Sequence, residues 1–336
     1  MKILALQFKY FGDAVLLTPA LRALRAHFPQ DEIHLLVPAE IAPLFVNLPW
    51  LNRVWAMPRR RGRARLRETW PLIRALRREH FDRSVDFATN DRGAIVGLFA
   101  GARRRLGWEA GGGFWGRRFC YHDRVPPPAG DQPEAARLAA LLAGWKIPPP
   151  DTMELEIRAD PALAGPAGNI MPQTGAVLCH VASSQPKKEW PLTHWAEFHR
   201  LARAAGRPLV FTTAPGEREA ARMAELKRLA PDAPILPEIP ELPLFLAVLS
   251  RADVFISGDT GPLHFAAGLG VATIGLFGPT SALLWGPAGH RRRNVQCHHC
   301  DCSPSSPVCE AVRHCMAEIQ PQEVLQTLQT LPARTP

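Results

Sequence analysis

The hydrophobic positions of the chain form short apolar runs that alternate with longer segments of helical period. Residues 3–8 form the first run, and residues 14–29 continue with apolar positions at helical spacing as far as Pro29. The alternation continues with strands expected at 31–38, 54–58 and 81–87 and helices at 67–80 and 91–102. Such a pattern predicts an α/β fold with a parallel sheet.

The same alternation begins again in the second half of the chain. Residues 159–175 are rich in Pro, Gly and Ala and predict a linker. After it we expect strands at 176–182, 208–214, 253–259 and 271–279, and helices at 193–206, 217–230, 243–252, 262–270 and 321–331. We therefore predict two Rossmann-like domains, residues 1–165 and 166–336, facing each other across a cleft between the carboxyl ends of their strands.

Composition narrows the possible partners. The 336 residues include 46% hydrophobic and 21% charged residues, as in a soluble globular protein. No apolar run reaches the roughly 18 residues that span a bilayer, and the first residues lack the features of a signal peptide. We expect a cytoplasmic protein.

Positive charge is concentrated in a few arginine-rich runs. The net charge is +9, and Arg59–Arg65, Arg103–Arg105 and Arg291–Arg293 carry much of the excess. Such clusters favour an anionic partner, namely a phosphorylated substrate or an anionic membrane face; the alternative is a solvated arginine-rich surface. With only 2 Tyr and no RNA-binding motif, the sequence does not favour nucleic acid.

The segment SGDTGPLHFAAGLG, residues 257–270, follows an expected strand and opens an expected helix. Gly258 and Gly261 allow the backbone to approach a ligand, and the first amides of the helix suit a diphosphate. Asp259 would repel phosphate, so sugar hydroxyls are its more plausible partners. An ordinary capped turn is the alternative, but it explains neither the second glycine nor His264.

The first strand-to-helix turn, FKYFGDAVLLTPAL, contains a single glycine beside Asp13. It lacks the three glycines of the GxGxxG dinucleotide fingerprint, so a nicotinamide dehydrogenase is not expected. Asp13 is either a helix cap or a general base that points toward a substrate hydroxyl.

A third strand end carries the segment HVASSQPKKEWP, residues 180–191. Ser183 and Ser184 can donate to phosphate oxygens, and Lys187 or Lys188 can neutralise a departing diphosphate. Glu217, just after the next strand, is a candidate for binding the nucleoside. Each residue also has a structural explanation without a ligand: the lysines could be a solvated pair, and Glu217 could be an acid in the first turn of a helix. However, all of them are expected at the same edge of the sheet, which favours a shared site.

The cysteines are unevenly distributed. Five of the seven lie between Cys297 and Cys315, in the segment CHHCDCSPSSPVCEAVRHC. Cys297 and Cys300 form a CxxC pair that, with Cys309 and Cys315, could hold a structural zinc ion. Reduced thiols without metal, and a disulfide or redox role, are the alternatives.

With these residues assembled, the chain resembles the ADP-heptose:lipopolysaccharide heptosyltransferases, inverting glycosyltransferases with the GT-B fold. The segments that carry the resemblance span nearly the whole chain and are KILALQFKYFGDAVLLTPALRALRAHFP, HVASSQPKKEWP, SGDTGPLHFAAGLGVATIGLFGPT and CMAEIQPQEVLQTL. The family usually carries threonine at one or both of the positions of Ser183 and Ser184, a small departure.

The resemblance implies roles for individual residues. Asp13 would be the catalytic base and Lys188 would stabilise the ADP leaving group. The implied donor-binding residues are Ser183, Ser184, Lys187, Glu217, Asp259, Thr260, Gly261 and His264. The implied acceptor-binding residues are Arg59, Arg60, Arg61 and Arg63, with Arg103–Arg105 as a further candidate.

The resemblance also implies the reaction and its setting. Heptose would pass from ADP-heptose to a Kdo or heptose of the lipid A-core acceptor in a single in-line displacement that needs no cofactor. We expect a monomer, peripheral on the cytoplasmic face of the inner membrane. The alternatives are a GT-B-like transferase or epimerase that uses another nucleotide-sugar, and a basic, zinc-bearing module that binds nucleic acid.

Overall fold

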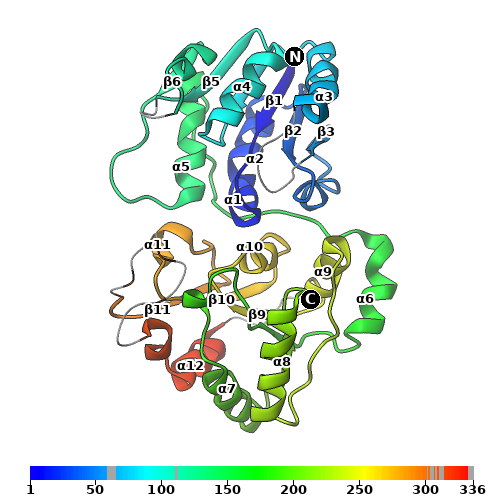
Figure 1. Ribbon diagram of the computed structural model, residues 1–336, viewed down its shortest axis with the longest axis vertical. Coiled ribbons are helices and arrows are strands. Elements are labelled where there is room, and N and C mark those ends of the chain that lie inside the picture. The colour runs from blue at the N-terminus through cyan, green and yellow to red at the C-terminus, as the bar shows by residue number, and fades with distance from the viewer. Residues whose placement is uncertain are drawn as a thin grey trace. The chain divides into compact units, whose positions relative to one another are not determined.

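The computed structural model describes residues 1–58, 66–109, 113–300, 302, 306, 309 and 314–331. The chain divides into two compact units, Met1–Met153 and Glu154–Pro336. Each unit has its own parallel sheet (Figure 1). The division falls earlier in the chain than the boundary that we predicted after residue 165.

Unit 1 contains a six-stranded sheet in the order β3-β2-β1-β4-β5-β6, and every neighbouring pair is parallel. Its strands are β1 (Lys2–Leu6), β2 (Glu32–Pro38), β3 (Arg53–Met57), β4 (Arg83–Asp86), β5 (Arg104–Trp108) and β6 (Asp123–Val125). Its α-helices are α1 (Phe11–Leu16), α2 (Thr18–His27), α3 (Leu66–Arg78), α4 (Asp91–Ala100) and α5 (Glu134–Ala140). Its short 3₁₀ helices are η1 (Ala42–Leu44), η2 (Arg117–Cys120) and η3 (Leu141–Trp145). The strand order reverses between β1 and β4, the place where Rossmann-type sheets bind ligands.

Unit 2 contains a five-stranded parallel sheet in the order β11-β10-β9-β7-β8. Its strands are β7 (Val177–His180), β8 (Leu209–Thr212), β9 (Val254–Gly258), β10 (Ala272–Phe277) and β11 (Arg292–Gln296). Its α-helices are α6 (Ala164–Ile170), α7 (Leu192–Ala204), α8 (Glu217–Leu229), α9 (Leu242–Leu249), α10 (Gly261–Gly268), α11 (Ala282–Trp285) and α12 (Pro321–Thr330). Its 3₁₀ helices are η4 (Pro161–Leu163), η5 (Pro186–Lys188) and η6 (Cys315–Glu318). Here the order reverses between β7 and β9.

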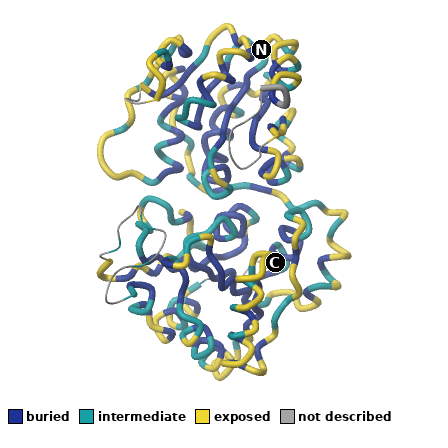
Figure 2. The backbone as a smooth tube through the Cα atoms, in the orientation of Figure 1, coloured by how far each residue is buried: buried dark blue, intermediate teal, exposed yellow. Residues whose placement is uncertain are grey.

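The central strands read as unbroken apolar runs because both faces of each sheet are covered. All six residues of β10 and all four of β7 are buried, and Figure 2 shows buried backbone through the middle of each unit. Trp190, Trp195, Phe198 and Phe211 belong to the core of unit 2 and are at most 1% exposed. Their rings pack edge to face, with the centroids of Trp190 and Trp195 4.7 Å apart.

Two expectations about local structure were wrong. The single helix expected at 14–29 is two helices, α1 and α2, because Pro19 suits a first helical turn and cannot donate to a preceding one. The linker expected at 159–175 contains η4 and α6. Asp160 caps η4 by accepting a hydrogen bond from the amide of Ala162 at 2.9 Å, and Arg251 Nε donates to the carbonyl of Met171 at 2.7 Å. The segment is therefore an integral part of unit 2.

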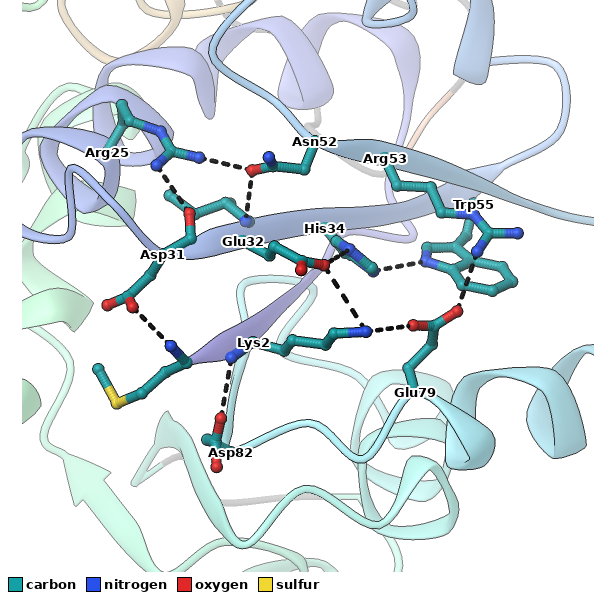
Figure 3. A network of polar contacts seen from close by, with 12 residues as sticks. Lys2, Arg25, Asp31, Glu32, His34, Asn52, Arg53, Trp55, Glu79 and Asp82 are labelled. Atoms are coloured by element: carbon teal, nitrogen blue, oxygen red, sulfur yellow. Dashed lines mark hydrogen bonds and ion pairs between the residues drawn. The ribbon is translucent and has the colours of Figure 1, made fainter.

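A polar network covers the edge of the first sheet where the strands begin (Figure 3). Lys2 Nζ lies 2.8 Å from Glu79, whose other oxygen lies 2.9 Å from Arg53. The amide of Lys2 donates to Asp82 at 2.9 Å. Ligands of such sheets bind at the opposite edge, so we assign this network to stability.

Candidate active site

Two loops meet at the switch point of the second sheet. One follows β7 and runs through η5, and the other follows β9 and leads into α10. The contact is close, because a Cβ added at Gly258 would lie 2.6 Å from the carbonyl oxygen of Lys188. Glycine is thus required at the end of β9 for the two loops to touch. This place is the one where an open parallel sheet forms its ligand site.

Lys188 and Asp259 form an ion pair at this junction. Lys188 Nζ donates to Asp259 Oδ2 at 2.6 Å, and the two side chains are 19% and 11% exposed. The neighbouring Lys187 is only 2% exposed. Lys188 is therefore the lysine whose ammonium is held at the strand ends by Asp259.

The loop that carries Ser183 is held by a buried carboxylate. Glu189, 7% exposed, accepts a hydrogen bond from the Ser183 amide at 2.9 Å. The same carboxylate pairs with Arg218 at 2.5 Å and with Arg222 at 3.1 Å. Arg218 also donates to the carbonyl of Ser183 at 3.1 Å. Both polar backbone groups of Ser183 are thus fixed, while Ser184 is exposed.

The helix α10 begins directly after Asp259. Thr260 is its N-cap residue and lies with Oγ1 3.4 Å from Ser257 Oγ, while its side chain makes no capping hydrogen bond to the helix. Pro262 has no N–H, and the Leu263 amide donates to the Thr260 carbonyl at 3.2 Å. The Gly261 amide therefore has no side-chain cap and suits an incoming anion.

His264 lies in the first turns of α10 and is 3% exposed. Burial lowers its pKa to about 4, an effect that the charge of Asp259 partly offsets. The imidazole is therefore neutral near pH 7. In this state one ring nitrogen can donate a hydrogen bond and the other can accept one.

Several buried polar atoms at this sheet edge have no hydrogen-bond partner among the described residues. They follow four neighbouring strands and are His180 Nδ1 at β7, Thr213 Oγ1 after β8, His264 Nδ1 after β9 and Thr280 Oγ1 after β10. Unpaired buried atoms also occur elsewhere in the described residues, for example on His199, but these four are placed to pair with a ligand at this edge.

Glu217 is the first residue of α8 and is exposed. Among the described contacts it takes no part in the Glu189 network that its neighbour Arg218 joins. Its assignment to the nucleoside stays a prediction.

In unit 1, Asp13 lies in the first turn of α1, just after β1 at the switch point of that sheet. Its side chain is 12% exposed, and Lys9 Nζ lies 3.8 Å from Oδ1. Burial raises the pKa of Asp13, although the charge of Lys9 opposes the rise. A carboxylate with a raised pKa is a stronger base than an exposed one.

A second carboxylate lies close to Asp13. Glu134 of α5 pairs with Lys9 at 3.3 Å and accepts both hydrogen bonds of an Arg137 fork, at 2.5 and 2.6 Å. Burial opposes its ionisation, but Arg137 and Lys9 hold its pKa below the usual value. The Lys9 ammonium thus interacts with two carboxylates, Glu134, which stays ionised, and Asp13.

The arginines predicted to bind the acceptor, Arg59, Arg60, Arg61 and Arg63, lie outside the described residues. Arg104 pairs with Asp123 at 2.7 and 2.8 Å, and Arg105 donates to the carbonyl of Cys120 at 2.6 Å. Both lie where β5 begins, at the edge opposite Asp13. These contacts do not support an acceptor role for Arg103–Arg105.

The cysteine segment brings together a set of thiols that differs from the predicted one. The Sγ atoms of Cys300, Cys302 and Cys315 lie within 4.8 Å of one another, and Cys309 Sγ lies 3.2 Å from that of Cys302. Cys297 instead donates to the carbonyl oxygens of Gly278 and His299 at 3.4 and 3.5 Å. All seven cysteines belong to the described part of the chain, and none forms a disulfide there.

Comparisons with known proteins identify the family of this chain. The family model described as glycosyltransferase family 9 (heptosyltransferase) matches residues 69–312, more than half of the chain. The chain belongs to this family. It is therefore a glycosyltransferase of the lipopolysaccharide heptosyltransferase type.

Individual relatives cover almost the whole chain. Lipopolysaccharide heptosyltransferase 2 of Escherichia coli K12 is 24% identical over 357 residues, which span 98% of both proteins. A solved glycosyltransferase family 9 structure from Veillonella parvula has a TM-score of 0.87 at 17% identity and covers 98% of this chain and 96% of its own. The E. coli heptosyltransferase WaaC with ADP has a TM-score of 0.72 at 20% identity, covering 98% and 99%. These structures confirm the predicted GT-B fold.

Some residues of this candidate site were not predicted as part of it. Glu189, Arg218 and Thr280 are examples, although Glu189 and Thr280 lie inside two of the segments that carry the family resemblance. The available signal was their position after apolar strands. It could not show that Glu189 turns inward to bind the amide of Ser183, since that contact depends on how α8 packs.

Proposed function

We propose that this enzyme transfers heptose from ADP-heptose to a Kdo or heptose hydroxyl of the lipopolysaccharide inner core. The observation that carries the proposal is the Lys188 ammonium, held by Asp259 at the switch point of the sheet in unit 2. Family membership and the printed names of relatives, which are lipopolysaccharide heptosyltransferases and include an ADP-heptose heptosyltransferase, support this choice of donor and acceptor class.

In this proposal the donor binds to unit 2. Its diphosphate lies between Lys188 and the first amides of α10, where an ammonium and the positive end of a helix dipole both favour negative charge. Ser183, Ser184 and Thr260 supply hydroxyl donors, and Lys187 adds positive charge beneath the loop. Asp259 and the neutral His264 face the hydroxyls of the sugar, and Glu217 faces the nucleoside.

The reaction is a single in-line displacement with inversion at the anomeric carbon. As the acceptor oxygen bonds to that carbon, Asp13 takes the hydroxyl proton. The bond between the carbon and the phosphate oxygen breaks, and ADP leaves with the electron pair. Lys188 and the α10 dipole stabilise the charge that develops on ADP, so we expect no divalent metal to be needed for the chemical step.

The acceptor is amphiphilic, so the enzyme must work at a membrane surface. None of the helices in the described ranges is long and apolar enough to cross a bilayer. Exposed apolar side chains of unit 1 gather on α4 and the adjoining segment around η2, namely Ile95, Leu98, Phe99, Phe114, Trp115 and Phe119. Arg118 lies 4.7 Å from the Phe119 ring. Aromatic and arginine side chains together suit the anionic cytoplasmic face of the inner membrane.

The test is acceptor-dependent release of ADP from ADP-heptose, with deep-rough core lipopolysaccharide as the acceptor. We expect Asp13→Ala and Lys188→Ala to lower the rate by orders of magnitude relative to the native chain. Consumption of the donor without any acceptor would point to an epimerase or hydrolase instead. No binding of an ADP-sugar would overturn the proposal.

A further inference from the structure

Four sulfur atoms gather in the segment between β11 and α12. The three Sγ atoms of Cys300, Cys302 and Cys315 are mutually within 4.8 Å, and Cys309 Sγ is 3.2 Å from Cys302 Sγ. These cysteines are separated in sequence by as many as fifteen positions, so their convergence is produced by the fold rather than by a single turn.

The spacing suits one metal ion. In a tetrahedral thiolate site with metal–sulfur bonds of about 2.3 Å, neighbouring sulfurs lie about 3.8 Å apart. The three Sγ atoms of Cys300, Cys302 and Cys315 already lie within 4.8 Å of one another, and Cys309, which touches Cys302 at 3.2 Å, is the fourth ligand that must move toward the other two thiols. Four thiolates select Zn²⁺ or iron over Mg²⁺ and Ca²⁺.

Cys297 lies beside Cys315 but also contacts backbone oxygens, so we leave it out of the ligand set. Its Sγ is directed to two carbonyl oxygens, Gly278 O at 3.4 Å and His299 O at 3.5 Å. Both thiols of the CxxC pair that the sequence favours lie near Cys315, and the carbonyl contacts of Cys297 are what distinguish it from Cys300.

The thiol segment packs on the loops of the candidate donor site. A Cβ added at Gly278, directly after β10, would lie 2.9 Å from Cys315 Sγ and 2.5 Å from Met316 Sδ. Trp190, two residues after Lys188, donates its indole hydrogen to the carbonyl of Ile319 at 2.9 Å. Fixing the position of Cys315 should therefore also restrict the motion of the two neighbouring loops, the one that carries Lys188 and the one that carries Gly278.

We propose that Cys300, Cys302, Cys309 and Cys315 bind one Zn²⁺ or Fe²⁺ ion as a tetrathiolate site that braces the Lys188 and Gly278 loops. Binding releases the thiol protons and leaves no open coordination position, so the ion is structural. The description of these loops as donor loops rests on the proposed function, but the metal site itself does not.

The first experiment measures metal in the purified full-length chain by elemental analysis. We expect about one Zn or Fe per native chain. Cys300→Ser and Cys315→Ser should lose it, while Cys297→Ser, the matched control from the same segment, should retain it. Loss from Cys297→Ser with retention in Cys309→Ser would overturn the ligand set.

A second readout avoids dependence on variants that fail to fold. Metal-free native chain titrated with Co²⁺ alone should develop thiolate-to-cobalt absorption and the visible bands of a tetrahedral ion, with an end point at about one equivalent. Absence of metal in the native chain together with absence of these bands would overturn the site.

The brace is tested by hydrogen exchange with and without the metal. Removal of the ion should speed amide exchange in residues 186–190 and 277–280 more than in the strands of unit 1. Unchanged exchange in those loops would overturn the brace. Because none of these measurements requires sugar transfer, their failure is distinguishable from failure of the proposed function.

Discussion

Lys188 and Asp259 are 71 positions apart in sequence, yet Lys188 Nζ lies 2.6 Å from Asp259 Oδ2. Parallel neighbours in the sheet place the loops after β7 and β9 side by side. The pair fixes the ammonium at the strand ends before any substrate binds. A preorganised charge stabilises a leaving group without reorganisation during the reaction.

The first prediction concerns this ammonium. Lys188→Ala should lower kcat/KM by about 10²–10³-fold, because the charge on departing ADP loses its counter-charge. ADP binding, measured by calorimetry, should also weaken. Lys227→Met, which changes an exposed lysine of α8, is the control and should leave both quantities near native values. Native kinetics in Lys188→Ala would contradict the assignment.

The two roles available to Asp259 can be separated. Asp259→Asn keeps the size of the side chain but removes the charge that holds Lys188. If Asp259 also binds heptose hydroxyls, affinity for ADP-heptose should fall more than affinity for ADP. An equal fall for both ligands would restrict Asp259 to positioning Lys188.

The second prediction is a pH dependence that arises at Asp13. Since burial raises the pKa of Asp13, kcat/KM should fall on the acid side at a higher pH than an exposed aspartate would cause. Protonation there removes the base. Asp13→Asn should lower kcat by about 10²–10⁴-fold and abolish this acid limb, with ADP affinity unchanged.

The matched control for Asp13 is Asp31→Asn, which alters the opposite edge of the same sheet, where Asp31 pairs with the terminal amine. It should keep the native pH profile. Persistence of the acid limb in Asp13→Asn would assign that limb to another group.

The apolar runs predicted both sheets and the strand ends that carry the site. Glu189 and Cys302 could not be selected in this way, because what distinguishes them is a contact made across the fold. The edge strand β11 was missed because its residues, RRNVQ, are mostly polar. Local spacing likewise favoured Cys297, whereas in the fold that thiol also contacts the carbonyl oxygens of Gly278 and His299.

The third prediction tests the contact between the two loops. Gly258→Ala would place a methyl group 2.6 Å from the backbone oxygen of Lys188, which has no rotamer that could relieve the clash. We expect a loss of about 1–3 kcal/mol in the free energy of unfolding and weaker ADP binding. The loss of stability and the weaker ADP binding would both arise because the methyl group displaces η5, which carries Lys188.

Gly168→Ala is the control for this substitution, because a Cβ there lies 3.6–3.9 Å from the guanidinium of Arg251, an ordinary contact distance. In the helix α6 the alanine should be neutral or stabilise by up to about 1 kcal/mol. Urea unfolding and ADP calorimetry on both variants check the prediction. Normal ADP affinity in a folded Gly258→Ala protein would contradict it.

The fourth prediction concerns stability and a buried carboxyl group in unit 1. Asp86 ends β4 and is 2% exposed. It accepts hydrogen bonds from Tyr121 at 2.6 Å and from the amide of Ala88 at 2.9 Å. Burial raises its pKa from 3.8 to about 6, although the Tyr121 hydrogen bond opposes the rise. The folded state therefore binds this proton more tightly than the unfolded chain does.

It follows that the contribution of Asp86 to stability is full below about pH 4 and is lost as the pH rises through about 6. The loss is on the order of 2–3 kcal/mol. Asp86→Asn keeps an acceptor for Ala88 and supplies an amide donor to Tyr121, so this variant should unfold with a smaller difference between pH 5 and pH 8. Asp151→Asn, at an exposed position, should keep the native difference. Equal pH dependence of native chain and Asp86→Asn in denaturant titrations would show that Asp86 is ionised in the folded protein throughout this range.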